Sequence, residues 1–323
     1  MKNILVTGGA GYIGSNIIRV LIKKKLNVIS LDNLSTGHKK LIHPKSFFYR
    51  SDILDFNRIK KIIKNHNIDS IIHCAAKLNV NESQKRPKFY FQNNVKGTKI
   101  LLDACVDTNI KNFLFSSSCA VYGDKKKIPI AEIATTKPVS NYGKTKLKAE
   151  KLIKKYFKGN IAILRYFNVV GASSDNKFGQ INKNGQLFKN LSLEVLKKKP
   201  IISVFGNNYK TKDGTCLRDY IHVEDLANIH VEILKNMFAT NMSGIFNCGY
   251  GKPYSVIEII RVFEKIAKKK IKIVIKKKRN GDIEKIYANN NKISKRIKYN
   301  FKFKNLKKII NSCILWEKKL NCV

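Results

Sequence analysis

The sequence lacks the long hydrophobic runs and the paired cysteines that mark membrane-spanning and disulfide-rich proteins. No apolar run in the 323 residues reaches the ~18 that a membrane-spanning helix needs. The seven cysteines are scattered without a C-x-x-C pair, so we expect reduced thiols rather than disulfides or a zinc site. The first strand pattern begins at residue 3 and leaves no space for a signal peptide. These features predict a cytoplasmic protein with no membrane association.

Arginine and acidic residues are also scarce. Only 22 residues are acidic against 64 basic ones, which gives a formal net charge of +42, yet just nine of the basic residues are arginines. Proteins that read nucleic-acid grooves or clamp phosphates favour the forked guanidinium, whereas the lysines here are spread over the whole chain. We interpret the charge as a solvated lysine surface and expect no nucleic-acid partner, although such a surface would attract a dianionic substrate.

The first half of the chain alternates strand and helix patterns, as a parallel sheet with crossover helices does. No internal repeat is visible, and after about Gly171 the pattern changes to polar loops and short strands. This predicts an α/β protein with a Rossmann-type doubly wound parallel sheet in residues 1–172 and a smaller C-terminal α/β domain in residues 173–323, with a boundary that the chain may cross again. The expected strands are 3–7, 27–32, 46–50, 70–73, 112–116 and 161–165, and the expected helices are 15–25, 55–65, 95–108 and 142–156.

A glycine-rich segment, TGGAGYIG at residues 7–14, follows the first strand and opens a helix. It satisfies G-x-G-x-x-G through Gly9, Gly11 and Gly14, and G-x-x-G-x-x-G from Gly8. Such glycines let the backbone approach a pyrophosphate that sits on the helix N-terminus. Asp32, at the end of the second strand, places a carboxylate for the adenosine ribose and repels a 2′-phosphate. Because no arginine follows to neutralise that phosphate, the segment predicts NAD rather than NADP.

Two further patterns lie near the same edge of the sheet. Asp52 and Ile53 follow the third strand, where they would meet the adenine, although Asp52 would equally serve to cap the helix that starts near residue 55. Tyr142 and Lys146 form a Y-x-x-x-K pair whose spacing puts both side chains on one helix face. A tyrosine is a poor base near pH 7 unless positive charge lowers its pKa, and Lys146, together with oxidised nicotinamide, would supply that charge. Ser118, after the fifth strand, is placed to bind the substrate oxygen.

With these motifs together, the chain resembles the UDP-glucose 4-epimerases of the extended short-chain dehydrogenase/reductase family. The most specific stretch is FGNNYKTKDGTCLRDYIHVED at residues 205–225. Asn141, Val169 and Asn280 stand where that family usually has proline, which relaxes loops without removing a chemical group. The other matching stretches are VTGGAGYIGS at 6–15, Asp32-Asn33, SDILD at 51–55, NNVKGT at 93–98, FSSSCAVYGD at 115–124, YGKTK at 142–146 and RYFNVVGA at 165–172.

The resemblance implies a mechanism and a set of site residues. Tyr142 would take the proton of the sugar 4-hydroxyl with help from Ser118, while the C4 hydride passes to bound NAD and returns to the other face of a 4-keto intermediate. The substrate would be UDP-glucose or UDP-galactose. The implied catalytic residues are Ser118, Tyr142 and Lys146; the cofactor residues are Gly8, Gly11, Tyr12, Ile13, Gly14, Asp32, Asn33, Asp52, Ile53, Asn93, Tyr142 and Lys146; and the substrate residues are Ser118, Asn168, Gln186, Leu187, Phe205, Arg218, Arg279, Asp282 and Ile286.

Two expectations concern assembly and substrate size. The resemblance implies a homodimer through helices 95–108 and 142–156, which carry more apolar positions than one buried face needs. It also implies that Ile286 gates the space beside the C2 substituent of the sugar, because a stiff β-branched side chain there would admit N-acetylated sugars only weakly. The alternative interpretation of Ile286 is an ordinary strand core residue.

Three other functions remain as alternatives. One is a UDP-sugar 4-epimerase with a different preference, for UDP-N-acetylglucosamine or UDP-glucuronate. A second is a nucleotide-sugar dehydratase or reductase, although Cys119 and Ala120 stand where dehydratases carry an acidic pair. The third is an inactive module that senses NAD or binds RNA, which the intact set of Ser118, Tyr142 and Lys146 argues against.

Overall fold

A seven-stranded parallel sheet forms the larger part of the computed structural model, which describes residues 2–183, 186–279 and 282–321. Its order, β10-β6-β5-β4-β1-β2-β3, confirms the Rossmann-type fold, and the six expected strands agree within two residues at each end. The strands are β1 (Asn3–Thr7), β2 (Asn27–Asp32), β3 (Phe47–Arg50), β4 (Ser70–His73), β5 (Asn112–Ser118), β6 (Asn160–Tyr166) and β10 (Gly244–Cys248).

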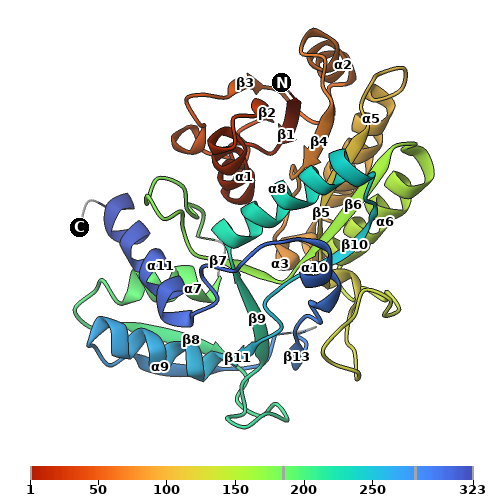
Figure 1. Cartoon of the computed structure of the whole chain (residues 1–323). Coiled ribbons are helices and arrows are strands. Elements are labelled where there is room, and N and C mark those ends of the chain that lie inside the picture. Colours follow the sequence, from red (N-terminus) through yellow and green to blue (C-terminus); the bar gives the residue numbers. More distant parts are fainter. Residues whose placement is uncertain (1, 184–185, 280–281, 322–323) are drawn as a thin grey trace.

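The three central residues of strand β1, Ile4, Leu5 and Val6, are apolar because helices cover both faces of the sheet. Successive side chains of a strand point to opposite faces, and accordingly Ile4 and Val6 pack in one hydrophobic core while Leu5 packs in the other. The first core lies under α1 (Tyr12–Lys23) and α8 (Val223–Thr240). The second lies under the helices α2 (Phe56–Asn65), α5 (Gly97–Ala104) and α6 (Asn141–Tyr156). Figure 1 shows these helices around the sheet.

The helix expected at residues 95–108 is divided. A π-helical turn, Gln92–Lys96, comes first, and regular α-helix runs only from Gly97 to Ala104. The helix stops there because the chain turns, with Asp107 in the left-handed region at φ 55°. Single π-helical turns such as Gln92–Lys96 are frequent at functional sites. The short helices α3 (Val80–Lys85) and α4 (Pro87–Phe91) precede it.

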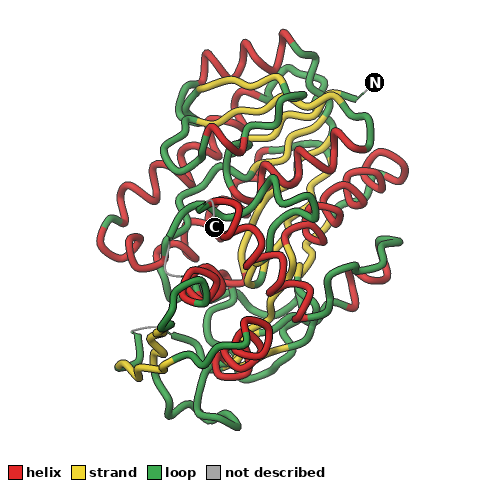
Figure 2. Tube along the Cα trace, turned by 90° about the vertical axis from the view of Figure 1, so that its left-hand side faces the viewer, coloured by secondary structure: helices red, strands yellow, loops and turns green. Residues whose placement is uncertain are grey.

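Beyond residue 172 the chain contributes to both parts of the fold. Helix α8 packs against α1, and β10 pairs with β6 at the edge of the large sheet. The remaining strands form two small sheets at the other end of the molecule, as Figure 2 shows. One sheet comprises β7 (Asn168–Val170), β9 (Leu217–His222), β11 (Pro253–Ser255) and β13 (Lys285–Ile286), and the other pairs β8 (Ile201–Phe205) with β12 (Lys272–Lys276).

Helices complete this second part. They are α7 (Leu187–Glu194), α9 (Val256–Ala267), α10 (Asn291–Arg296) and α11 (Leu306–Leu320). Their apolar residues belong to the same core as α1 and α8, so the two parts of the fold share one interior. In the described part of the chain, no helix combines the length and the apolar character required to cross a bilayer.

Candidate active site

The strand order reverses at β1, which lies between β2 and β4, and ligands of open α/β sheets bind beyond the carboxyl ends of strands at such a point. The glycine segment occupies this place. Gly8 has φ +71°, and a Cβ atom on it would stand 2.7 Å from the backbone nitrogen of Ala75; a Cβ on Gly14 would overlap the Gly8 carbonyl oxygen. Only glycine fits these positions. Helix α1 then begins without a side-chain cap, so its N-terminus suits a pyrophosphate.

Asp32 ends β2 beside this loop and is 7% exposed. Its carboxylate accepts hydrogen bonds from the backbone nitrogens of Ala10, at 3.1 Å, and Leu34, at 2.8 Å. Burial raises the pKa of Asp32, and these two hydrogen bonds oppose the rise. The carboxylate is therefore oriented by the glycine loop itself, which suits the expected contact with the adenosine ribose.

The neighbouring adenosine-side residues also lie together. Asn33 donates a 2.6 Å hydrogen bond to Asp52, and Ile53 packs on Gly97, where a Cβ would stand 2.7 Å from its side chain. The cap of α2 is Asp55, whose carboxylate accepts from the helix backbone. Asp52 does not cap that helix, because its carboxylate bonds Asn33 and the Leu54 backbone instead.

The expected catalytic residues come from β5 and α6. Ser118 is the last residue of β5, and Tyr142 and Lys146 lie in the first two turns of α6. The hydroxyl of Tyr142 interacts with the Ser118 side chain. Lys146 is 4% exposed and donates a 2.7 Å hydrogen bond to the carbonyl oxygen of Ser116. Asn93 lies on the π-helical turn, whose next residue, Asn94, donates to Thr145 of α6.

Burial shifts the pKa values of this pair in opposite directions. Burial raises the pKa of Tyr142 to about 12, and the interaction with Ser118 lowers it only in part. Burial also lowers the pKa of Lys146 to about 8, with Cys74 and Glu150 opposing. The physical reason is that the chain encloses both groups, and desolvation disfavours the charged form of each. The expected lowering of the Tyr142 pKa by Lys146 and oxidised nicotinamide stays a prediction.

Buried polar partners beneath the pair were not predicted. Glu150, one helical turn beyond Lys146, accepts hydrogen bonds from Ser117 and from Arg165 of β6. The available signal was the spacing of Tyr142, Lys146 and Glu150, each four residues apart on one face of α6.

A second unpredicted network contains a histidine. His73, at the end of β4, bonds Thr7 at 2.7 Å and Thr98 at 3.0 Å. Burial lowers its pKa to about 3, which makes it a neutral structural group that links the carboxyl ends of β1 and β4 to α5. A histidine inside an apolar strand carried no sequence signal that separates this role from catalysis.

The expected substrate residues form two neighbouring groups. Arg279 stacks on Phe205, with its guanidinium carbon 3.8 Å from the ring centroid. Arg218 on β9 lies 3.8 Å from the Asp282 carboxylate and donates to the Leu217 carbonyl oxygen. The backbone also joins them, because the Asp282 nitrogen donates to the Arg279 carbonyl oxygen. Asn280, one of the departures from the resembled family, lies outside the described residues.

The other substrate residues lie on separate elements. Asn168 begins β7 and is exposed, and Gln186 and Leu187 stand at the N-terminus of α7. Within residues 2–183, 186–279 and 282–321, no hydrogen bond or ion pair joins these side chains to Arg218 or Arg279. Over the same ranges, no three His, Cys, Asp or Glu side chains are grouped as a metal site, and the six described cysteines are free.

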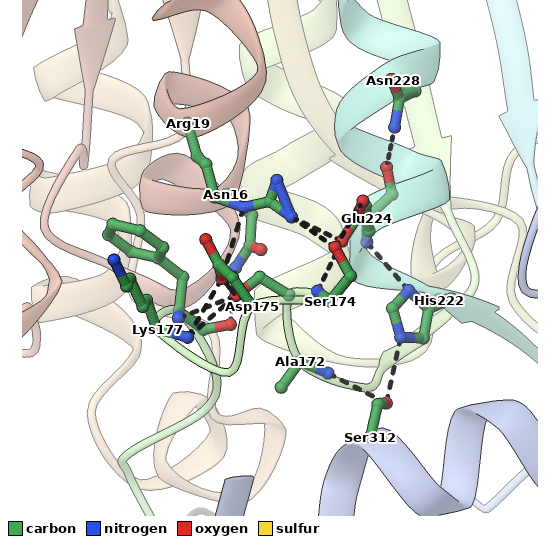
Figure 3. Close-up of polar contacts among 12 residues, drawn as sticks. Asn16, Arg19, Ala172, Ser174, Asp175, Lys177, His222, Glu224, Asn228 and Ser312 are labelled. Atoms are coloured by element: carbon green, nitrogen blue, oxygen red, sulfur yellow. Dashed lines mark hydrogen bonds and ion pairs between the residues drawn. The ribbon is translucent and has the colours of Figure 1, made fainter. Parts of the chain in front are cut away.

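A cluster of hydrogen bonds ties the cofactor helix to the second part of the fold (Figure 3). Arg19 of α1 donates to Glu224 of α8 at 2.6 Å, and the backbone nitrogen of Ser174 donates to the same carboxylate at 2.7 Å. The Tyr12 hydroxyl, in the first turn of α1, donates to the Gly171 carbonyl oxygen at 2.6 Å. The segment after β7 is thereby fixed to the helix that carries the glycine loop.

The fold is that of an NAD-dependent enzyme of the short-chain dehydrogenase/reductase type. Comparison with known proteins supports this class. A profile of the NAD dependent epimerase/dehydratase family matches residues 4–249, and the chain belongs to that family. It is 40% identical over 319 residues to the UDP-glucose 4-epimerase of Lactobacillus helveticus, covering 98% of this chain and 97% of that one.

Two solved structures are similar over the whole chain. A UDP-glucose-4-epimerase from Stenotrophomonas maltophila, with bound NAD and formylated UDP-arabinopyranose, superposes with a TM-score of 0.95 at 33% identity, covering 100% of this chain and 99% of that one. The UDP-Glc/GlcNAc 4-epimerase of Campylobacter jejuni gives a TM-score of 0.85 at 34% identity, covering 99% and 100%.

Proposed function

We propose that the protein is an NAD-dependent UDP-sugar 4-epimerase that interconverts UDP-glucose and UDP-galactose. The observation that carries this proposal is the convergence of Ser118, Tyr142 and Lys146 at the carboxyl edge of the sheet, beside an uncapped glycine-rich helix N-terminus and Asp32. Family membership and relatives named UDP-glucose 4-epimerase support it.

The residues of this chain divide the work between proton transfer and binding. Tyr142 takes the proton from the sugar 4-hydroxyl and later returns it, and Ser118 holds the oxygen. Lys146 supplies positive charge near the phenolate that forms and a donor for the cofactor ribose. Bound NAD supplies a reversible hydride acceptor at C4 of the sugar. Because the pKa of Tyr142 is raised to about 12 by burial, its deprotonation depends on positive charge at the site.

Arg218 and Arg279 hold the diphosphate while the 4-keto sugar rotates about it, since a forked guanidinium binds paired oxygens. Phe205, on which Arg279 stacks, lies beside the uracil, and Asn168, Gln186 and Leu187 complete the substrate site. Residues 1–172 with α8 and β10 form the NAD-binding part, and the rest of residues 173–323 forms the UDP-sugar part.

We also propose a homodimer in the cytoplasm, as part of galactose metabolism. The free cysteines support the location. The dimer surface is the outer face of α6 and its neighbours, because Leu101, Leu102 and Ile153 are used in the protein's own core while Leu152 is partly exposed and Phe91 is 43% exposed.

The test is conversion of UDP-galactose to UDP-glucose by the purified protein, with Tyr142→Phe as the decisive variant. Removing the base should lower turnover by at least ~10² while binding of the UDP-sugar survives. Tyr156→Phe makes the same change on an exposed residue of the same helix and should retain normal turnover. A nearly normal rate in Tyr142→Phe would refute the proposed mechanism, and an inactive wild-type protein would refute the proposed reaction.

A further inference from the structure

The face of α6 that carries Tyr142 and Lys146 continues to a third buried residue. Glu150 is 1% exposed and lies four residues beyond Lys146, so it shares that face. Its carboxylate accepts from Arg165 through both oxygens, from Nε at 3.0 Å and from Nη2 at 2.7 Å, and from the Ser117 hydroxyl at 2.5 Å. Ser117 lies between Ser118 and Ser116, whose carbonyl oxygen binds Lys146.

These contacts join the three elements that build the chemical site. Glu150 belongs to α6, Ser117 to β5 and Arg165 to β6. The guanidinium of Arg165 also stacks over the ring of Tyr122, 4.7 Å from its centroid. A carboxylate with this many donors is held in one orientation, so it fixes the rotation of α6 against the strand that ends in Ser118.

The charge of Glu150 matters because Lys146 has no ion-pair partner among the described residues. Its ammonium group donates to a neutral carbonyl oxygen and lies 4.8 Å from the ring centroid of Phe115. The titratable groups around it come from each neighbouring element: His73 at the end of β4, Cys74 after it, Tyr166 on β6, and Tyr142 and Glu150 on α6.

Glu150 is the carboxylate side chain of this set. Burial lowers the pKa of His73 to about 3 and raises that of Cys74 to about 11, so both are neutral. Burial raises the pKa values of Tyr142 and Tyr166 as well. Glu150 accepts a hydrogen bond from Arg165 at each of its two oxygens. Its carboxylate opposes the burial that lowers the pKa of Lys146.

We propose that Glu150 is a positioning residue of the epimerisation site, which orients α6 through Ser117 and Arg165 and keeps the buried ammonium group of Lys146 charged. Its carboxylate contacts Ser117 and Arg165, so it acts through them and not as a catalytic group. The proposal rests on the function proposed above, because it assumes that Lys146 must be charged for Tyr142 to act.

The test compares variants that separate the charge of Glu150 from its ion pair. Glu150→Gln removes the charge, whereas Arg165→Met breaks the pair and leaves the carboxylate near Lys146. The double variant Glu150→Gln/Arg165→Met avoids an unpaired buried guanidinium, so it covers the case in which Glu150→Gln fails to fold. Glu232→Gln, the same change in a partly exposed pair on α8, is the matched control.

We expect the alkaline limb of the kcat profile for UDP-galactose to move down by about one pH unit in Glu150→Gln and in the double variant, with little change in KM. In Arg165→Met the thermal midpoint falls but the limb stays, and Glu232→Gln behaves as wild type. Glu150→Asp keeps the negative charge, so its alkaline limb should lie between those of wild type and Glu150→Gln. If both single variants lose stability and neither moves the limb, Glu150 is only structural and the proposal is wrong.

The same variants distinguish this failure from failure of the proposed reaction. An active wild type with an unmoved limb in Glu150→Gln refutes the role of Glu150. A wild type inactive on UDP-galactose refutes the proposed reaction. In that case the pH dependence of NAD affinity is measured instead of kcat, because Lys146 contributes to NAD binding through the ribose. An identical NAD limb in wild type and Glu150→Gln refutes the role of Glu150 in that case also.

Discussion

Replacement of Ile286 by glycine tests whether the substrate size limit lies in strand β13. Ile286 is 4% exposed and packs in a small core with Tyr122 and Phe167. Its backbone pairs with Arg218, and Cys119, next to Ser118, borders the same core. The side chain thus lies in a core that adjoins both the chemical residues and an expected diphosphate ligand. This position is compatible with a gate and with an ordinary core residue, so the two interpretations must be separated by experiment.

The size of the effect follows from the atoms removed. Truncating a buried isoleucine costs about 2–5 kcal/mol, and glycine within a strand adds about 0.5–1 kcal/mol, so the free energy of unfolding should fall by several kcal/mol. The isoleucine side chain has four carbon atoms, and an N-acetyl group adds three non-hydrogen atoms to a hydroxyl, so the space released suits the larger substituent. Relief of such a clash is worth about 1–3 kcal/mol, or roughly ten- to 200-fold.

The assay measures kcat/KM for UDP-galactose and for UDP-N-acetylgalactosamine in wild type and in Ile286→Gly. Wild type should turn over the N-acetylated sugar weakly, and the glycine variant should improve the ratio at least about tenfold. Ile286→Val is the control, because it keeps the β-branch and costs only about 1 kcal/mol, so the ratio should hardly change. A folded Ile286→Gly whose ratio equals that of wild type would show that Ile286 is a core residue and not the gate.

Four further predictions concern the cofactor, the lysine, assembly and pH. Denaturing the purified protein should release NAD in near-equal amount to protein, and release of NADP or failure to bind NAD would contradict the role of Asp32. Lys146→Ala should lose most turnover at pH 7, since the charge near Tyr142 is gone; normal kcat would contradict this. Light scattering at micromolar concentration should give a homodimer, and a monomer would overturn that proposal. Burial lowers the pKa of His230 to about 4, below its unfolded value of about 6.5, so the stability it contributes is complete above pH 6.5 and is lost as the pH falls toward 4. His230→Phe should therefore flatten the slope of unfolding free energy against pH by about 1.4 kcal/mol per unit between pH 4 and 6.5, and an unchanged slope in urea titrations would contradict the shift.

The large sheet was predictable because its buried strands carry apolar runs that are visible in the sequence. A strand covered on both faces carries a continuous apolar run, and Ile4, Leu5 and Val6 form such a run in the middle of β1. Strand β10 was harder, because Gly244–Cys248 reads as one short strand among several and only its partner, β6, assigns it to the large sheet. The π-helical turn at Gln92–Lys96 has no sequence period of its own, so the expected helix there was too long.

The site separates in the same way into local and tertiary information. The glycine segment and the spacing of Tyr142 and Lys146 are local, and the sequence located them. The direction of their pKa shifts depends on what encloses them, which involves Ser118 and the strands beneath α6, and this tertiary surrounding cannot be read from spacing. Glu150 was missed for a related reason: its position on the face was visible, but its partner Arg165 lies on a different element.

The large excess of lysine carries less functional information than the burial of individual residues. Among the described residues two lysines are buried, Lys146 and Lys189, and each has a defined partner: the Ser116 carbonyl oxygen for the first and the Glu317 carboxylate for the second. A buried ammonium group is costly to desolvate unless the fold supplies hydrogen bonds or an opposite charge. Lys189 is neutralised by its ion pair with Glu317 between α7 and α11, whereas Lys146 donates to a neutral acceptor beside the proposed chemical site, which fits the role proposed for it.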